Sequence, residues 1–236
     1  MCVVAHPDDE CFAFGGALAL AADSSIETYV VCLTDGQAAS NRGTAASGED
    51  LGRMRREEFT ASCEILGVSK HELMEFQDAH LEFADFSEVA GLLVVKMRAF
   101  KPQVVLTFAP DGALNTHPDH TMVSAFTSAA YHWAASEKRY PEAGPAHHAE
   151  RLYMLTTSFF MEDRPAPMPA PWTVKLDIRS VMARKHLAFE QHTSQKPLLE
   201  RTRAMFEEFG DAEYYTLAAA REPQPAALAT GLFTGL

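Results

Sequence analysis

Four side chains capable of acid–base or metal chemistry stand within five residues near the N-terminus. The segment Ala5–Glu10 (AHPDDE), which contains them, directly follows the apolar run Met1–Val4. A short buried strand ending here would place these groups at its carboxyl end, where ligands bind in open α/β sheets. If the chain turns helical at Pro7, His6 and Asp9 point the same way, because residues three apart share a helix face.

A second cluster, His117–His120 (HPDH), repeats this chemistry much later in the chain. A catalytic zinc ion typically has three protein ligands and one position for water. His6, Asp9 and one histidine of the second cluster satisfy that count. The other histidine could donate a hydrogen bond to an oxyanion, and Asp119 could orient one imidazole.

The carboxylate of Asp8 supplies the remaining group that hydrolysis by such a site requires. Zinc lowers the pKa of bound water toward ~7, and an adjacent carboxylate can accept its proton as a general base. The alternative is that each cluster is only a strand-to-helix turn, where carboxylates cap the helix. Because both clusters follow predicted strands, we favour a metal site.

The elements that must position these clusters alternate along the chain. Hydrophobic patterning predicts strands over residues 1–5, 27–34, 72–77, 104–108, 152–156 and 173–177. It predicts helices over residues 10–22, 49–66, 85–101, 120–138, 178–192 and 198–209, with Asp85 and Glu88 forming a capping box. This order predicts an α/β fold with a Rossmann-like, mostly parallel sheet and helices on both faces.

Candidate catalytic residues follow each of the first four predicted strands. They therefore fall at one edge of the predicted sheet, which argues more strongly for a site than either motif alone. The small and polar residues 37–48 lie beside this edge, and we expect them to form a mobile loop that acts as a lid.

Composition limits the class of protein. We expect residues 1–222 to form a single domain and residues 223–236 a C-terminal tail. A formal charge of −12 argues against binding to nucleic acid or to an anionic membrane, and no apolar run is long enough to span a bilayer. The N-terminus does not read as a secretory signal, and the four cysteines lack CxxC spacing, so we expect a cytoplasmic protein.

The paired motifs AHPDDE and HPDH carry a family resemblance. The chain resembles the PIG-L/LmbE-type zinc-dependent N-deacetylases, which act mostly on N-acetylglucosaminyl conjugates. Further similarity lies in Thr34-Asp35-Gly36, in Arg55 with Glu58, and in the segment from Lys185 through His192 to Ser194-Gln195. The resemblance covers roughly residues 1–197 and implies hydrolysis of an acetyl amide.

Carried over by motif position, the resemblance implies that His6, Asp9 and His120 bind one Zn²⁺ per chain. Fe²⁺ or Co²⁺ could occupy a site of two histidines and one aspartate as well. Asp8 would be the general base. His117 would stabilise the oxyanion, and Asp119 would hold His117 in place.

Two further residues are candidate substrate contacts. For Arg55 the alternative is a surface ion pair with Glu58, three residues along the same predicted helix. Asp78 stands at the end of a predicted strand and could reach the substrate, or it could merely begin a turn.

We therefore expect a hydrolase that removes an acetyl group from an amino-sugar conjugate of the N-acetylglucosamine type. One alternative is an amidase that acts on a larger N-acyl or S-conjugate substrate. Others are a phosphoesterase using Mg²⁺ or Mn²⁺ and a non-catalytic sugar- or metal-binding protein on the same fold. The proline-rich loop 165–171 and the apolar tail could mediate a homo-oligomer or be exposed connectors.

Overall fold

The computed structural model describes residues 1–159, 166–223 and 228–234, in which strands and helices alternate. These residues form seven strands: β1 (Cys2–Val4), β2 (Tyr29–Thr34), β3 (Lys70–Phe76), β4 (Val104–Phe108), β5 (Arg151–Thr156), β6 (Val174–Asp177) and β7 (Ala212–Ala220). They also form seven α-helices: α1 (Asp9–Phe12), α2 (Gly15–Asp23), α3 (Gly48–Leu66), α4 (Phe86–Phe100), α5 (Pro118–Ala134), α6 (Met182–Glu190) and α7 (Lys196–Phe209). The predicted α/β class is confirmed.

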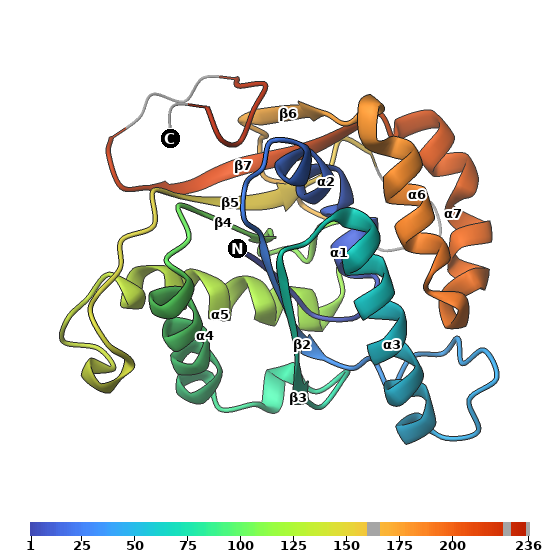
Figure 1. Cartoon of the computed structure of the whole chain (residues 1–236), viewed down its shortest axis with the longest axis horizontal. Coiled ribbons are helices and arrows are strands. Elements are labelled where there is room, and N and C mark those ends of the chain that lie inside the picture. The colour runs from blue at the N-terminus through green and yellow to red at the C-terminus, as the bar shows by residue number, and fades with distance from the viewer. Residues whose placement is uncertain (160–165, 224–227, 235–236) are drawn as a thin grey trace. The chain divides into compact units, whose positions relative to one another are not determined.

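The first of two compact units comprises Cys2–Ala79 and Leu176–Glu213. In it β1 pairs with β2, and β2 pairs with β3, both in parallel (Figure 1). Every residue of β1 and β2 is buried, as expected of the continuous apolar runs of a parallel sheet. Helix α6 packs against α1, α2 and α3.

The second unit comprises Met1, His80–Lys175 and Tyr214–Leu236. Here β4 pairs with β5 in parallel, and β5 pairs with β7 in antiparallel orientation, while α4 packs against α5 (Figure 1). Strands β6 and β7 each run from one unit into the other. Strand pairing is thus mixed but mostly parallel.

Local signals in the sequence explain several helix ends. The side chain of Ser47 caps α3 by accepting the backbone N–H of Asp50, and Gly67 ends the helix in the left-handed conformation at φ 78°. Asp85 accepts the N–H of Glu88 at the start of α4, which confirms the N-cap half of the predicted capping box.

The predicted helix over residues 10–22 is wrong as one element, because the chain forms α1 and α2 with a break at Ala13 and Phe14. The carboxylate of Glu213 accepts the backbone N–H groups of Gly16 and Ala17 at 2.7 and 3.0 Å and starts a second helix there. These two N–H groups belong to the first turn of α2, where a helix has no carbonyl partners of its own to offer them.

Strand β7 was not predicted, and most other elements differ from their predicted limits by a few residues at one or both ends. The predicted helix over 178–192 begins only at Met182, after a turn, whereas the predicted helix over 120–138 begins earlier, at Pro118. In the tail, Ala229 forms a parallel bridge with Val174. Residues 224–227 and 235–236 of the tail, and Pro165 of the proline-rich loop, lie outside the described residues.

Candidate functional site

His6 and Asp9 lie together just beyond the end of β1, in the first unit. The His6 Nδ1 atom is 3.5 Å from Asp9 Oδ2, and both residues are buried. Asp9 Oδ2 also accepts the backbone N–H groups of Ala5 and His6, at 3.1 and 2.8 Å. These bonds fix the carboxylate against the turn that follows the strand.

Asp78 orients the imidazole of His6. Its Oδ1 atom is 3.0 Å from His6 Nε2, and its Oδ2 atom accepts the N–H of Ala38 at 2.9 Å. Burial would raise the pKa of Asp78, but the hydrogen bond and charge of His6 outweigh it and lower that pKa to about 2. Since a carboxylate only accepts, Nε2 carries the proton, and a neutral His6 then has its lone pair on Nδ1, beside Asp9.

Asp8 occupies a backbone conformation that residues with a Cβ rarely adopt. Its φ is 107°, and it stands at the N-cap position of α1. Burial raises the pKa of its carboxyl to about 6, although the nearby Arg55 guanidinium acts in the opposite direction. A carboxylate with that pKa is ionised at pH 7 and can accept a proton, as a general base must.

Arg55 lies in α3 and is buried, with 3% of its surface exposed. Its guanidinium donates to Asp8, Pro7 and Gly36, so the alternative of a surface ion pair with Glu58 is not what the structure has. Whether it also contacts the substrate, as the family resemblance implies, stays a prediction.

A buried pair beside Asp8 was not singled out from the sequence. The His192 Nε2 and Glu10 Oε1 atoms are 2.8 Å apart, and both side chains have no exposed surface. Ser62 donates to the same Glu10 oxygen, and the other oxygen accepts the N–H of Asp8 at 2.9 Å. The adjacency of Glu10 to the motif was the available signal, and nothing local pointed to His192 as its partner.

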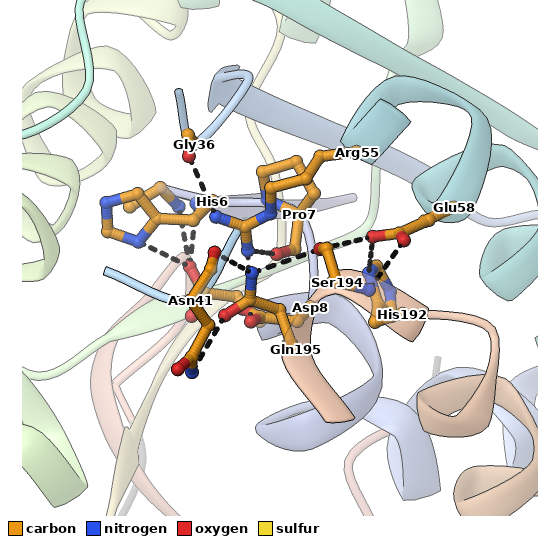
Figure 2. Close-up of polar contacts among 12 residues, drawn as sticks. His6, Pro7, Asp8, Gly36, Asn41, Arg55, Glu58, His192, Ser194 and Gln195 are labelled. Atoms are coloured by element: carbon orange, nitrogen blue, oxygen red, sulfur yellow. Dashed lines mark hydrogen bonds and ion pairs between the residues drawn. The ribbon is translucent and has the colours of Figure 1, made fainter. Parts of the chain in front are cut away.

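The loop 37–48 is docked onto the segment after α6, as Figure 2 shows. The side chain of Gln195 donates to the Asn41 backbone carbonyl at 3.2 Å and to the Ser194 hydroxyl at 3.0 Å. Ser194 in turn donates to Glu58, through both its N–H and its hydroxyl. The loop is therefore tied to α3 through a chain of polar contacts.

His120 lies in the first turn of α5, in the second unit. Its ring stacks on Phe108 at a centroid separation of 3.9 Å and an angle of 5°. Its Nδ1 atom is 3.2 Å from the carbonyl oxygen of Gly112. Because a carbonyl only accepts, Nδ1 carries the proton, and a neutral His120 has its lone pair on Nε2.

His117 is the N-cap of α5, and Pro118 is its first helical residue. The His117 Nδ1 atom accepts the backbone N–H of Asp119 at 3.1 Å, which places the ring proton of a neutral His117 on Nε2. The Nε2–H group of His117 is the kind of donor that an oxyanion requires. The carboxylate of Asp119 is buried and accepts the N–H of Leu81 at 3.2 Å.

These donor groups have the chemistry that zinc prefers. Each unit presents an imidazole in which one nitrogen faces an oxygen acceptor, so the other carries a lone pair. The first unit adds the buried carboxylate of Asp9. Imidazole nitrogen and carboxylate oxygen are ordinary zinc ligands, and acceptors behind the imidazoles fix their tautomers.

Comparison with known proteins shows the family. The sequence model of the PIG-L family, described as GlcNAc-PI de-N-acetylase, matches residues 1–131, which is more than half of the 236 residues. The chain belongs to this family, and the resemblance inferred from the two motifs is confirmed.

Individual relatives agree with this assignment. The chain is 30% identical over 205 residues to a probable N-acetyl-alpha-D-glucosaminyl L-malate deacetylase 2 of Bacillus cereus, and the match covers 86% of each chain. It is 34% identical over 174 residues to a mycothiol S-conjugate amidase of Streptomyces coelicolor, a match covering 65% of this chain and 59% of the amidase. The N,N'-diacetylchitobiose deacetylase of Pyrococcus horikoshii shares the fold, with a TM-score of 0.74 at 24% identity over 92% of this chain and 82% of that one.

None of the helices in the described part of the chain combines the length and the apolar character needed to cross a membrane.

Proposed function

We propose that this protein is a metal-dependent hydrolase that removes the acetyl group from an amino-sugar conjugate of the N-acetylglucosamine type. The observation that carries the proposal is a pair of oriented imidazoles. One ring nitrogen of His6 faces the Asp78 carboxylate, and one ring nitrogen of His120 faces the Gly112 carbonyl. Each acceptor fixes the proton on the nitrogen that it faces, so the other nitrogen of each neutral ring carries the lone pair that a metal needs. Membership of the PIG-L family and the name of the Bacillus relative support the same reaction.

His6, Asp9 and His120 are the proposed ligands of one zinc ion, although Fe²⁺ or Co²⁺ would suit the same donors. When bound, the metal lowers the pKa of water and polarises the amide carbonyl. We further propose that residues 1–222 act as one deacetylase domain, because the family model runs through residues of both units. With its four cysteines free and buried, we propose that it works in the cytoplasm on small-molecule conjugates.

The protein's own side chains divide the remaining work. The Asp8 carboxylate accepts a proton from the attacking water as the new C–O bond forms at the amide carbon. The Nε2–H group of His117 donates to the oxygen that gains negative charge, and Asp119 holds that ring through its backbone N–H. Breaking the C–N bond releases acetate, and the amine leaves with the proton that Asp8 took up.

One alternative has its own support, since the Streptomyces relative is named an amidase on an S-conjugate. The same groups would cleave a larger acyl chain, so only the acyl specificity differs. We rank this alternative below deacetylation, because the match to the Bacillus deacetylase covers a larger share of both chains than the match to the amidase does.

The test is acetate release from N-acetylglucosamine conjugates by zinc-loaded, chelator-treated and metal-restored protein. The proposal expects release that is lost with the metal and returns with it, and that falls by 10²–10⁴-fold in Asp8→Asn, the range typical of a general base. Cleavage of larger acyl groups without acetate release would support the alternative. Full activity in the chelated protein, or in Asp8→Asn, would refute the mechanism.

A further inference from the structure

The carboxylate of Asp8 projects from a turn whose backbone would not keep this shape unaided. Positive φ at a residue with a Cβ persists only where the surroundings enforce it, and Asp8 has φ 107°. On one side, Glu10 accepts the N–H of Asp8, and Glu10 is itself held by Ser62 and His192.

On the other side the turn is held by Arg55, which reaches it from α3 (Figure 2). One terminal nitrogen, Nη2, donates to the carbonyl of Pro7 and to Asp8 Oδ2, the latter at 3.0 Å. The other, Nη1, donates to the carbonyl of Gly36 at 3.1 Å. A single planar guanidinium thus joins the backbone before Asp8, the Asp8 carboxylate and the turn after β2.

The fit around this guanidinium is tight. Gly36 has φ 68°, and a Cβ at this position would lie 2.0 Å from Arg55 Nη1. Arg55 is 3% exposed, and both of its terminal nitrogens donate to oxygen atoms of the protein. These bonds use three of the five N–H groups of the guanidinium, and all three hold the turn around Asp8.

We propose that Arg55 is a positioning residue for Asp8, and that its three contacts set the direction of the Asp8 carboxylate. This inference rests on the proposed function, in which Asp8 is the general base. It gives Arg55 a role beyond the substrate contact that the family resemblance implies. A lysine could replace one of the contacts but not all three, because only a guanidinium carries the fork of donors.

Three variants test the inference: Arg55→Met, Arg55→Lys and, as a control, Arg53→Met. Arg53 lies on the same helix and pairs with Asp50, but it is exposed, so the control removes the same charge without touching the turn. The measurements are kcat and KM for acetate release, together with hydrogen exchange of backbone amides 5–12 in the metal-free proteins. Exchange reads the turn without any contribution from the metal or the substrate.

A misplaced catalytic group can cost about 100-fold in rate, so we expect kcat to fall about 100-fold in Arg55→Met and less in Arg55→Lys. KM should stay within about twofold, since the lost interaction acts on the chemical step and not on binding. Exchange in residues 5–12 should accelerate in both Arg55 variants, and Arg53→Met should match the wild type. If Arg55→Met fails to fold, Arg55→Lys carries the same comparison.

A rise in KM with unchanged kcat would show that Arg55 contacts the substrate, and would overturn the inference while leaving the proposed function intact. Unchanged exchange in the Arg55 variants would also overturn it. If the wild type releases no acetate, the proposed function fails. Faster exchange confined to the Arg55 variants would then still support the clamp on Asp8, and unchanged exchange would refute it.

Discussion

Replacing His192 by alanine would measure how strongly the buried Glu10–His192 pair stabilises the first unit. The two side chains have no exposed surface, and their closest atoms are 2.8 Å apart. Removing one partner of a buried ion pair typically costs 3–5 kcal/mol, because the other charge stays buried. Ser62 and the N–H of Asp8 would still donate to Glu10, so we expect a loss near the lower limit, about 3 kcal/mol.

The assay is denaturant unfolding of the metal-free protein at pH 6, with His132→Ala as the control. His132 is exposed on α5, and removal of an exposed side chain usually changes the free energy of unfolding by less than about 0.5 kcal/mol. A loss below about 1 kcal/mol in His192→Ala would refute the reasoning, because an ion pair held this far from water must cost more to break.

The same pair predicts how stability depends on pH. Burial lowers the pKa of His192, but the charge and hydrogen bond of Glu10, helped by Asp8 and opposed by Arg55, raise it above the usual 6.5. A raised pKa stabilises the folded state fully below pH 6.5, and this contribution is lost as the pH rises through the raised value. Unfolding free energies measured from pH 6 to pH 9 should therefore fall more steeply in the wild type than in His192→Ala. Parallel curves would contradict the assignment.

Two other substitutions have defined outcomes. Asp78→Asn should weaken zinc binding about 10-fold, the lower end of the 10–100-fold loss typical when the group behind a ligating histidine is changed, because a neutral amide holds the His6 proton less strongly. Competition with a chromophoric chelator measures this, and unchanged affinity would argue against His6 as a ligand. Gln195→Ala should release the loop 37–48 from its contact with Asn41 and accelerate hydrogen exchange there. Unchanged exchange would mean that other contacts hold the loop.

Local patterns were sufficient to predict much of the fold. The buried runs of β1, β2 and β4, and the caps at Asp85 and Gly67, depend on near neighbours in sequence. The break between α1 and α2 depends on a carboxylate 197 residues further along the chain, and no local signal announces it. Strand β7 ends in small alanines and only partly alternates between buried and intermediate positions, so its pattern is weak.

The candidate site divides in the same way. The two motifs were enough to identify the ionisable residues, because histidines and carboxylates seldom stand this close together in a sequence. The partners of these residues come from distant segments. Asp78 lies far from His6 in sequence, and Arg55 turns toward Asp8 and not toward Glu58, its neighbour on the helix. His192 meets Glu10 across 182 positions. Contacts between residues this far apart in sequence depend on how the elements pack, and hydrophobic periodicity carries no information about that packing.

Zinc titration of the metal-free protein tests the proposed ligand set most directly. Wild type and the control His132→Ala should each bind one zinc ion per chain tightly. His6→Ala, Asp9→Ala and His120→Ala should remain folded in circular dichroism and lose that binding. A wild-type protein that binds no zinc, or any of the three variants retaining one tightly bound ion, would contradict the assignment of these residues as the metal site.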